Sequence, residues 1–352
     1  MNISTIDKIK LRAIACTVPE HVIDNKRFAV EHFTEDMTGT IQALGVLRRH
    51  TCINRETTAL TLGVESAKRL FSEINYDPSN IGAIVFVTLT PDSLMPNNAS
   101  AAHFLLGLPA NCAAFDINHA CSGYTYGLWV SSMICANIRK DVLLLDADTN
   151  SYYAAVKDKS TGLLFGDAGS ASLICYNEEV PQTKFCFFTD AEKRDALTLP
   201  GFGFKYPLTD DSLKFKSRED GSIRRDIDMF MDGENVFSYV VSKVPKQVKN
   251  LLNEIEMEPE EYKALVLHQA NAFMLRQMAR KIGFDKTQLP FSIQEYGNTS
   301  SVSIPLTIAS NKEVWGFDGL CLLVGMGAGL STGIVSVDLS SLEYAKVFQG
   351  EF

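Results

Sequence analysis

The sequence predicts an α/β protein whose chain divides into two similar halves. Strand-like apolar runs alternate with amphipathic helical patterns along most of the 352 residues, as in buried, largely parallel sheets covered by helices. A gap-free internal match between residues 67–87 and 248–268 indicates that this alternation is duplicated. In a protein of this kind, reactive groups are expected at strand ends where the halves meet.

The first half is expected to span residues 1–181. Its short apolar runs, bounded by turn-forming residues, predict strands, and its longer segments with apolar residues three or four apart predict helices. Strands are predicted at 11–18, 83–89, 113–117 and 141–147, and helices at 61–74, 98–106 and 122–138.

The second half, 182–352, begins with a stretch from about 182 to 228 in which phenylalanine, glycine, proline and charged residues cluster. This stretch is expected to form a long, irregular connection. The alternation then resumes, with helices predicted at 235–255, 271–283 and near 299–311, and strands at 264–268, 291–296, 321–327 and 333–339.

The two halves match at three places in the same order. The two matched segments each present an amphipathic helix, a proline-containing turn and a buried strand. Cys121 and Asn298 each follow a predicted strand and enter a predicted helix, and residues 141–145 resemble residues 318–323. A single match could arise between two common αβ units, whereas three ordered matches favour two similar halves packed face to face.

Composition argues against several classes of protein. The formal net charge of −9 disfavours an overall nucleic-acid binder or a protein of anionic membranes. The N-terminal segment lacks the apolar core of a signal peptide, and the apolar runs are too short to span a bilayer, so a cytoplasmic protein is expected. The eight cysteines include no CxxC pair and none lies at zinc-ligand spacing from a histidine, so no metal site is expected.

Cys121 is the candidate nucleophile. It lies between the predicted buried strand 113–117 and the helix predicted to follow. The first turn of a helix offers unpaired N–H groups and the positive end of its dipole, which stabilise a thiolate near neutral pH. Gly123 leaves room for a ligand to approach closely. On this segment alone, a small residue that fills a tight strand-to-helix turn is an equal alternative.

His268 and Asn298 are the candidate partners of Cys121. His268 ends an apolar strand, which places its imidazole at the rim of the sheet. Asn298 follows a glycine in a turn that enters a helix. Taken separately, a rim histidine is more often structural and an asparagine at this place is an ordinary helix cap. Taken together, the three residues bring a thiol, an imidazole and a neutral amide toward one cavity.

Two glycine-rich segments lie near these candidates. Residues 325–333 are expected to form a hairpin or loop whose backbone N–H groups contribute to an oxyanion hole. Residues 165–170 form a second tight turn. This turn lacks the lysine and the spacing of a phosphate-binding P-loop, so no phosphate site is expected there.

Several segments resemble the β-ketoacyl-acyl-carrier-protein synthase III family of the thiolase superfamily, and the resemblance extends over nearly the whole chain. The matching segments are VPEHVIDN (18–25), FDINHACSGYTYGL, LFGDAGSASLI, MFMDGENVF, HQAN (268–271), GNTSS and the terminal glycine-rich hairpin. The resemblance implies a thiolase-like fold of two pseudosymmetric αβ halves in a five-layered α-β-α-β-α core, normally assembled as a homodimer. It agrees with the duplication.

The resemblance also implies roles for individual residues. Cys121 would carry an acyl group, with its thioester oxygen held by the backbone N–H groups of Cys121 and Ala328. His268 and Asn298 would hydrogen-bond the thioester carbonyl of a malonyl group and stabilise the enolate that is left when carbon dioxide departs. The residues implied for the acyl pocket are Phe165, Met231, Met326 and Met95, the last of which the family inserts into the neighbouring subunit.

The implied activity is a decarboxylative Claisen condensation in fatty acid biosynthesis. An acyl group from acyl-coenzyme A or acyl-ACP would be loaded on Cys121 and would react with malonyl-ACP to give a β-ketoacyl product. No permanently bound cofactor is implied. The implied partners are acyl carrier protein, coenzyme A thioesters and a second copy of the chain.

Recognition of the acyl carrier departs from the family pattern, which identifies the chain as a divergent member. The stretch 36–49 lacks the tryptophan that helps to clamp coenzyme A, and the arginine that usually follows HQAN is Phe273. Ala328 replaces a usual glycine, and Thr332 replaces a usual tryptophan. Docking of the carrier or of coenzyme A is therefore assigned to Arg48, Arg49, Phe273, Arg276 and Arg280.

Two other functions stay open from the sequence. The acyl group on Cys121 could pass to an oxygen or nitrogen nucleophile without decarboxylation. The chain could also be a non-catalytic partner subunit, although such subunits usually lose the nucleophile. A papain-like hydrolase is disfavoured by the duplicated αβ halves. A hydroxymethylglutaryl-type synthase would need a glutamate near Cys121 to act as an acid. That glutamate is absent, and the nearby candidate for the acid, His119, is interpreted as structural.

Overall fold

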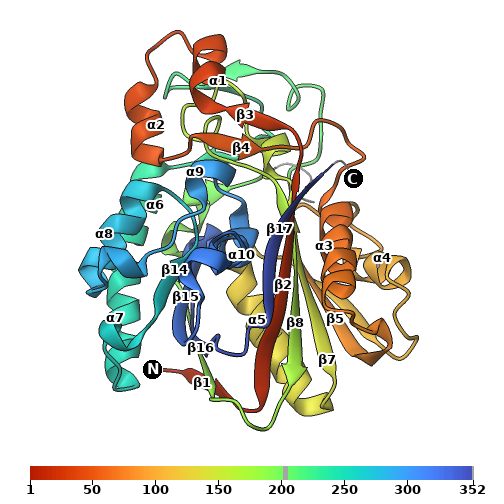
Figure 1. Cartoon of the computed structure of the whole chain (residues 1–352). Coiled ribbons are helices and arrows are strands. Elements are labelled where there is room, and N and C mark those ends of the chain that lie inside the picture. The colour runs from red at the N-terminus through yellow and green to blue at the C-terminus, as the bar shows by residue number, and fades with distance from the viewer. Residues whose placement is uncertain (201–204, 351–352) are drawn as a thin grey trace.

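Two mixed β-sheets and the helices that cover them are formed by residues 1–200 and 205–350, which the computed structural model describes (Figure 1). The first sheet has the strand order β17-β2-β8-β7-β5-β6, and the second has the order β1-β9-β16-β15-β14. The strands of the first sheet are β2 (Ile9–Pro19), β5 (Ile81–Val87), β6 (Ala113–Ile117), β7 (Asp141–Asp148), β8 (Ala168–Tyr176) and β17 (Tyr344–Gly350). Those of the second sheet are β1 (Ile3–Ile6), β9 (Thr183–Thr189), β14 (Ala264–Leu267), β15 (Leu320–Gly327) and β16 (Ser331–Asp338).

Helices follow most of these strands, and short strand pairs lie outside the two sheets. The helices are α1 (Asn25–His32), α2 (Thr38–Leu44), α3 (Ala59–Glu73), α4 (Asn98–Leu105), α5 (Gly123–Ile138), α6 (Gly233–Ser238), α7 (Val244–Glu254), α8 (Ala272–Ile282), α9 (Ile293–Tyr296) and α10 (Ser303–Trp315). The short strands pair as β3 (Val22–Asp24) with β4 (Arg48–His50), β10 (Leu197–Thr198) with β13 (Phe230–Met231), and β11 (Lys216–Ser217) with β12 (Ile223–Arg224).

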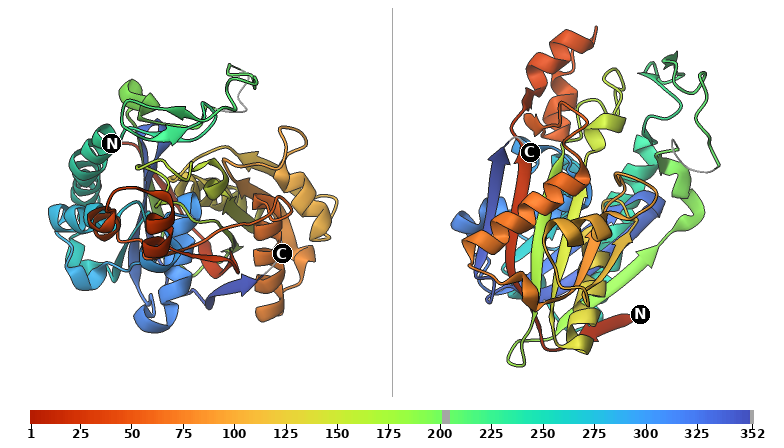
Figure 2. Two further views of the ribbon diagram at one scale, coloured as in Figure 1. Left: turned by 90° about the horizontal axis from the view of Figure 1, so that it is seen from above. Right: turned by 90° about the vertical axis from the view of Figure 1, so that its right-hand side faces the viewer.

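The helices and sheets stack in five layers, which confirms the predicted thiolase-like architecture (Figures 1 and 2). Helices α3 and α4 cover the outer face of the first sheet, where Leu62, Leu70 and Phe86 belong to one hydrophobic cluster. Helices α7 and α8 cover the outer face of the second sheet. Helices α5 and α10 lie between the two sheets and share one hydrophobic cluster with both.

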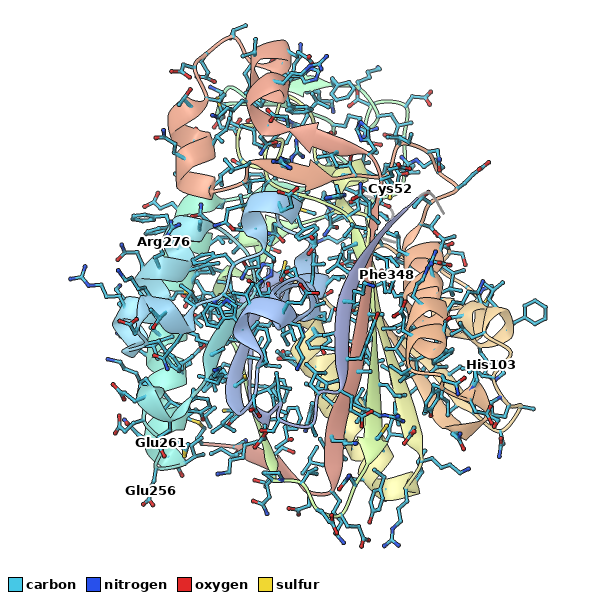
Figure 3. All side chains as sticks on the ribbon, in the orientation of Figure 1. Cys52, His103, Glu256, Glu261, Arg276 and Phe348 are labelled. Atoms are coloured by element: carbon cyan, nitrogen blue, oxygen red, sulfur yellow. The ribbon has the colours of Figure 1, made fainter. Side chains whose placement is uncertain are left out.

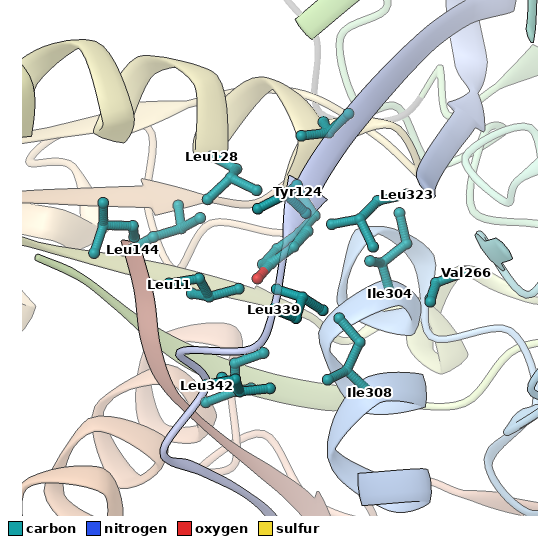
Figure 4. Packing of buried hydrophobic residues seen from close by; sticks show 14 of the residues in the cluster. Leu11, Tyr124, Leu128, Leu144, Val266, Ile304, Ile308, Leu323, Leu339 and Leu342 are labelled. Atoms are coloured by element: carbon teal, nitrogen blue, oxygen red, sulfur yellow. The ribbon is translucent and has the colours of Figure 1, made fainter. Parts of the chain in front are cut away.

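This central cluster fixes the two helices that lead to the site (Figure 4). Tyr124 and Leu128 from α5 and Ile304 and Ile308 from α10 belong to it, and each is at most 2% exposed. A 3.0 Å hydrogen bond also joins Tyr124 Oη to Ser172 Oγ on β8. Complete burial of a leucine or isoleucine is worth about 1.5–3 kcal/mol relative to exposure. The cluster therefore holds the N-terminal ends of α5 and α10 in place.

The internal repeat is confirmed in the structure. Helix α3, the 3-10 turn Pro78–Asn80 and β5 follow each other in the first half, and α7, the 3-10 turn Pro259–Glu261 and β14 follow each other in the second. Strand β5 pairs in parallel with β7, and β14 pairs in parallel with β15 in the corresponding register. The two sheets therefore share a central strand order, β2-β8-β7-β5 in one and β9-β16-β15-β14 in the other.

Several predicted elements differ from those observed. The sheets are mixed rather than largely parallel, because β8 and β16 run antiparallel to both of their neighbours. Residues 291–296 were predicted as a strand, but residues 293–296 form α9 instead, and the second sheet has no counterpart of β6 among the described residues. The strand 113–117 is half-exposed rather than buried, because β6 lies at the edge of its sheet.

The predicted connection from about 182 to 228 is regular at its start. Its first residues form β9, which pairs with β1 and β16 inside the second sheet, so this part of the prediction is wrong. In residues 190–200 and 205–228 the connection forms only short elements, as predicted. Residues 201–204 lie outside the described residues.

The terminal strands exchange sheets. Strand β1, near the N-terminus, joins the second sheet, whereas β17, near the C-terminus, pairs with β2 in the first. The predicted boundary between residues 181 and 182 stays a prediction, because each half also takes a strand from the far end of the chain. Within residues 1–200 and 205–350, no helix has the length and apolar character needed to cross a bilayer.

Candidate active site

Cys121, His268 and Asn298 line one cavity that encloses about 70 Å³. Cys121 comes from the start of α5, His268 from the end of β14, and Asn298 from the turn before α10. The other walls are mostly apolar and include Leu164, Leu197, Val240, Met274 and Leu330. The structure thus brings together the three residues that the sequence suggests as a set, with contributions from both halves.

Cys121 is packed closely at the tip of α5. It precedes Ser122, the N-cap of that helix, and is 5% exposed. A Cβ atom on Gly327 would lie 2.8 Å from Cys121 Cβ, so only glycine permits this approach. Ser300 Oγ donates a hydrogen bond to Cys121 Sγ at 3.7 Å. The helix end and the hydroxyl both favour negative charge on the sulfur.

Burial opposes this ionisation. It raises the pKa of Cys121 to about 12, an effect that the Ser300 hydrogen bond reduces and the carboxyl of Asp148 increases. The resting thiol is therefore protonated near neutral pH, because the stabilisation expected from the helix end does not outweigh the cost of burial. The proton must leave as the sulfur attacks, which requires a base in the cavity.

His268 is the titratable base among the described residues that line the cavity. It is 2% exposed, and its Nδ1 forms a 2.7 Å hydrogen bond with Ser303 Oγ. Burial lowers the pKa of His268 to about 4, although a backbone hydrogen bond with Ser300 acts in the opposite direction. The imidazole is therefore neutral at physiological pH. Because Nδ1 is engaged, Nε2 is the nitrogen available to a ligand.

Asn298 is oriented by the turn to which it belongs. Its backbone N–H donates to Leu164 O at 2.9 Å, and its side-chain Oδ1 accepts from the Ser300 N–H at 2.9 Å. Because Oδ1 is occupied, the Nδ2 group is left to donate into the cavity. Ser300 has a φ of 55°, a left-handed conformation that is uncommon for a residue other than glycine.

The residues predicted for the acyl pocket divide into two groups. Phe165, Met231 and Met326 line the cavity that contains Cys121. Met95 does not line it and is 87% exposed. An exposed methionine outside its own pocket is the geometry expected of a side chain that contacts a neighbouring subunit. The acyl-binding role of all four residues stays a prediction.

Tyr239 is a cavity residue that the sequence pattern does not indicate. It begins the π-helical turn Tyr239–Lys243 between α6 and α7, and its Oη shares a 2.7 Å hydrogen bond with Thr332 Oγ1. A π-turn widens the helical repeat by one residue, and the neighbours Tyr239 and Val240 both line the cavity. The pattern predicts one uninterrupted helix over 235–255, because no residue type marks such an insertion.

The predicted oxyanion hole lies beside the candidate nucleophile. Gly327 packs on Cys121 and is followed directly by Ala328, whose carbonyl accepts a hydrogen bond from Ser331 Oγ at 3.1 Å. The backbone N–H groups of Cys121 and Ala328 therefore belong to adjoining segments. Their joint action on a thioester oxygen stays a prediction.

Four of the five residues assigned to docking are exposed. Arg276 and Arg280 lie on the outer face of α8, and Figure 3 labels Arg276 there. Phe273 on the same helix is 47% exposed. Arg48 is also exposed and forms a 3.0 Å ion pair with Glu295.

Assigning Arg49 to docking is wrong. It is 3% exposed, and its guanidinium donates to Asn25 Oδ1 at 2.8 Å and to Phe165 O at 3.0 Å. Burial lowers the pKa of Arg49 to about 10, against the effect of the nearby Asp167 carboxyl. Arg49 therefore supports the segment that carries Phe165 and does not face a partner.

Comparison with known proteins gives a consistent set of relatives. The family model described as 3-oxoacyl-[acyl-carrier-protein (ACP)] synthase III matches residues 115–191, and the model of the C-terminal part of that enzyme matches residues 252–339. A beta-ketoacyl-[acyl-carrier-protein] synthase III from Streptococcus pneumoniae (strain Hungary19A-6) is 32% identical over 330 residues, which are 92% of this chain and 97% of that protein.

Solved structures resemble both halves. The 3-oxoacyl-(acyl-carrier protein) synthase from Burkholderia xenovorans LB400 superposes with a TM-score of 0.91 at 29% identity, over 99% of each chain. The 3-oxoacyl-(acyl carrier protein) synthase III from Pseudomonas aeruginosa PAO1 gives a TM-score of 0.79 at 26% identity, over 94% of this chain and 98% of that one. The likeness therefore covers the segments that carry Cys121, His268 and Asn298.

Proposed function

Because the chain belongs to the beta-ketoacyl-[acyl-carrier-protein] synthase III family, we propose that Cys121 carries the acyl group in a decarboxylative condensation with malonyl-ACP. The protein is a condensing enzyme of the acyltransferase class. The observation that supports this use of the site is the lining of one cavity by Cys121, His268 and Asn298. The acyl donor is a thioester of coenzyme A or of acyl carrier protein, and the setting is fatty acid biosynthesis in the cytoplasm.

In the first half-reaction the sulfur of Cys121 attacks the carbonyl carbon of the acyl thioester. His268 is neutral and can accept the thiol proton, which then passes to the leaving thiolate of the carrier. The backbone N–H groups of Cys121 and Ala328 would hold the carbonyl oxygen as it becomes negative. The products are the Cys121 thioester and the free carrier thiol.

In the second half-reaction the ring takes its other tautomer, in which Ser303 Oγ donates to Nδ1 and Nε2 carries the proton. The thioester oxygen of the malonyl group then lies between His268 Nε2 and Asn298 Nδ2. Carbon dioxide leaves, and negative charge moves onto that oxygen, where the two neutral donors stabilise it. The resulting carbanion attacks the Cys121 thioester, forms the new carbon–carbon bond and releases the Cys121 sulfur as a thiolate. This thiolate takes up one proton to restore the resting thiol, because the malonyl carboxylate has left as neutral carbon dioxide. The mostly apolar walls exclude water, which would otherwise protonate the carbanion.

Two substitutions test the roles of the two half-reactions. Cys121→Ser is expected to abolish the mass increase that intact-protein mass spectrometry detects after incubation with acyl thioesters. Asn298→Ala is expected to retain that mass increase but to lose release of labelled carbon dioxide from malonyl-ACP. Undiminished carbon dioxide release in Asn298→Ala contradicts the role of Asn298. Productive wild-type turnover without carbon dioxide would instead indicate transfer to oxygen or nitrogen, which the relatives do not favour.

The proposed assembly is a homodimer formed around the edge of the first sheet. Strand β6 is an edge strand, and such edges are ready to pair with another chain. Leu94, Met95 and Phe104 are 89%, 87% and 83% exposed, which is unusual for large apolar side chains on a free surface. Light scattering at working concentration tests the assembly, and a monomeric mass would exclude it.

A further inference from the structure

Asp146 and Asp148 form a buried acidic pair that the proposed reaction does not use. They lie two residues apart on β7, so their side chains share one face of the strand. The same face carries Val142 and Leu144, which belong to the cluster around α5 and α10. Both carboxyls therefore point into the central layer, and both residues are 0% exposed.

The two carboxyls are hydrogen-bonded unequally. Asp148 Oδ1 accepts from the Leu89 N–H at 2.9 Å and from Thr88 Oγ1 at 3.1 Å. Asp146 Oδ1 accepts from Ser301 Oγ at 2.5 Å, and its Oδ2 has no partner among the described residues. Ser301 Oγ is also 3.4 Å from Asp148 Oδ2, so one hydroxyl bridges both acids.

No positive charge balances this pair, because none of the ion pairs formed within residues 1–200 and 205–350 includes either acid. Burial raises the pKa of Asp146 well above its ordinary range, and Asp148 raises it further; burial also raises the pKa of Asp148 to about 6. The other titratable groups near Asp146 are Cys16, Cys121 and Tyr124, each neutral because burial raises its pKa. At neutral pH the pair therefore holds one proton, on Asp146.

The bridging serine belongs to the 3-10 turn Ser300–Val302, which orients the reactive groups. Ser300 in this turn donates its N–H to Asn298 Oδ1 and its hydroxyl to Cys121 Sγ. Its left-handed backbone is a conformation that costs about 1–3 kcal/mol and persists only where the surroundings fix it. The hydrogen bond from the next residue, Ser301, to Asp146 is one of the contacts that hold Ser300 in this conformation.

We propose that Asp146 is a positioning residue that, in its protonated form, anchors the 300–302 turn through Ser301 and thereby directs Asn298 and Ser300 toward Cys121. The proposal rests on the proposed function for its kinetic consequence. The proton matters because an ionised Asp146 would add negative charge beside a sulfur that must itself lose a proton. A neutral acid holds the turn without that repulsion.

Kinetic variants test the anchoring. Ser301→Ala removes the anchor, and Asp146→Ala removes its shorter contact and leaves the 3.4 Å approach to Asp148. In both variants the kcat of condensation is expected to fall by about tenfold to a hundredfold while the KM for malonyl-ACP changes by less than about threefold. Asp146→Asn keeps the shape without an ionisable proton and is expected to recover kcat to within about threefold of wild type. Ser132→Ala is the matched control, because it removes a buried hydroxyl on α5 that has no partner among the described residues.

Two measurements need no acyl substrate and so separate this proposal from the proposed function. Infrared difference spectra at neutral pH are expected to show a protonated carboxyl band in wild type that is missing in Asp146→Asn. Ser301→Ala is expected to slow alkylation of Cys121 by iodoacetamide about tenfold, because Ser300 loses its place beside the sulfur. If wild type is not acylated on Cys121, the proposed function fails while these two readouts still apply.

Three results would each overturn the role of Asp146. The first is an infrared spectrum that Asp146→Asn leaves unchanged. The second is a Ser301→Ala protein with wild-type kcat and wild-type alkylation. The third is an Asp146→Asn protein as slow as Asp146→Ala, which would show that the acid itself, and not the neutral shape, is required.

Discussion

The two halves present equivalent strands to the central layer but end them with different residues. In the shared register β7 corresponds to β15, so Asp146 lies where the second half has Gly325, and Asp148 lies where it has Gly327. The acids hold the turn before α10, whereas the glycines let α5 approach, since a Cβ atom on Gly325 would lie 2.9 Å from Ser122 Cα. Equivalent positions have therefore divided two tasks, anchoring in one half and close approach in the other.

The strand beside them shows the same divergence. His268 follows β14 at the position where β5 ends with Val87. Val87 is buried in the central cluster and approaches Gly123 and Gly127 of α5 so closely that neither glycine has room for a Cβ atom. His268 instead lines the cavity. At this position, therefore, one copy of the repeat carries a packing residue and the other carries a reactive one.

The largest effect is expected at the glycine that permits approach. A Cβ atom on Gly327 would lie 2.8 Å from Cys121 Cβ and 2.9 Å from Cys121 N. Gly327→Ala must therefore displace both the nucleophile and an oxyanion-hole donor, and we expect acylation of Cys121 to slow by about a thousandfold. Time-resolved intact-protein mass spectrometry measures this rate.

Gly39→Ala is the matched control, because no atom lies within 4 Å of a Cβ atom at Gly39 on α2. It is expected to acylate at the wild-type rate. If Gly327→Ala is instead acylated at the wild-type rate, the glycine at this position is not needed for the close approach to Cys121.

The next effect concerns stability and the residue that replaces Val87 in the second half. Burial lowers the pKa of His268 from its ordinary 6.5 to about 4, so between these values the unfolded chain binds this proton and the native chain does not. The neutral ring therefore contributes its full stability above the pKa of the unfolded chain. This contribution is lost as the pH falls through the pKa of the folded protein, and the free energy of unfolding decreases by up to about 3 kcal/mol.

Urea unfolding on both sides of this window checks the pH effect. Wild type is expected to lose more free energy of unfolding than His268→Gln when the pH is lowered from neutral to near the folded pKa. Equal losses in the two proteins would mean that His268 titrates as an exposed histidine and has not diverged from Val87 in this respect.

A smaller effect is expected in the second half, where the helix that precedes β14 is longer at its start than α3, the helix that precedes β5. Thr58 caps the start of α3, whereas at the equivalent place in the second half Tyr239 continues the helix through a π-turn and closes the cavity wall. Tyr239→Ala is expected to raise the ratio of octanoyl to butyryl loading on Cys121 by about tenfold, because added methylenes gain space.

Tyr239→Phe controls for the hydroxyl. It keeps the ring and removes the hydroxyl that bonds Thr332, so the loading ratio is expected to stay near the wild-type value. An unchanged ratio in Tyr239→Ala, measured by competition and mass spectrometry, would show that the extension does not limit acyl length.

Local sequence was sufficient for much of the fold. The segments 67–87 and 248–268 encode helix, turn and strand through periodicity and a proline, and both are observed as predicted. Residues 291–296 were misassigned because a short apolar run fits either a strand or a helix. The direction of β8 and β16 and the exchange of β1 and β17 depend on contacts between distant segments, which periodicity does not record.

The candidate site divides in the same way. Cys121, His268 and Asn298 were found because each stands in a distinctive segment at a strand or helix end. Arg48 and Arg49 were treated alike, yet one is exposed and the other is buried, because only the Arg49 guanidinium turns inward to bond Asn25 and Phe165. The bridge from Ser301 to Asp146 joins residues that no local pattern connects.

The smallest effect is expected on the outer surfaces of the helices that follow β5 and β14. Helix α4 exposes Phe104, whereas α8 exposes Arg276 and Arg280, which suits α4 to an apolar subunit contact and α8 to the phosphorylated arm of a carrier. Arg276→Ala is expected to raise the KM for malonyl-ACP by about threefold at low salt with little change in kcat, and this effect should shrink as salt screens the charge. Arg69→Ala on α3 removes another exposed positive charge, one that lies away from α8, and should leave KM unaltered. A fall in kcat, or a KM increase that ignores salt, would mean that Arg276 acts through the cavity wall beside Met274 and not through the surface on which α8 differs from α4.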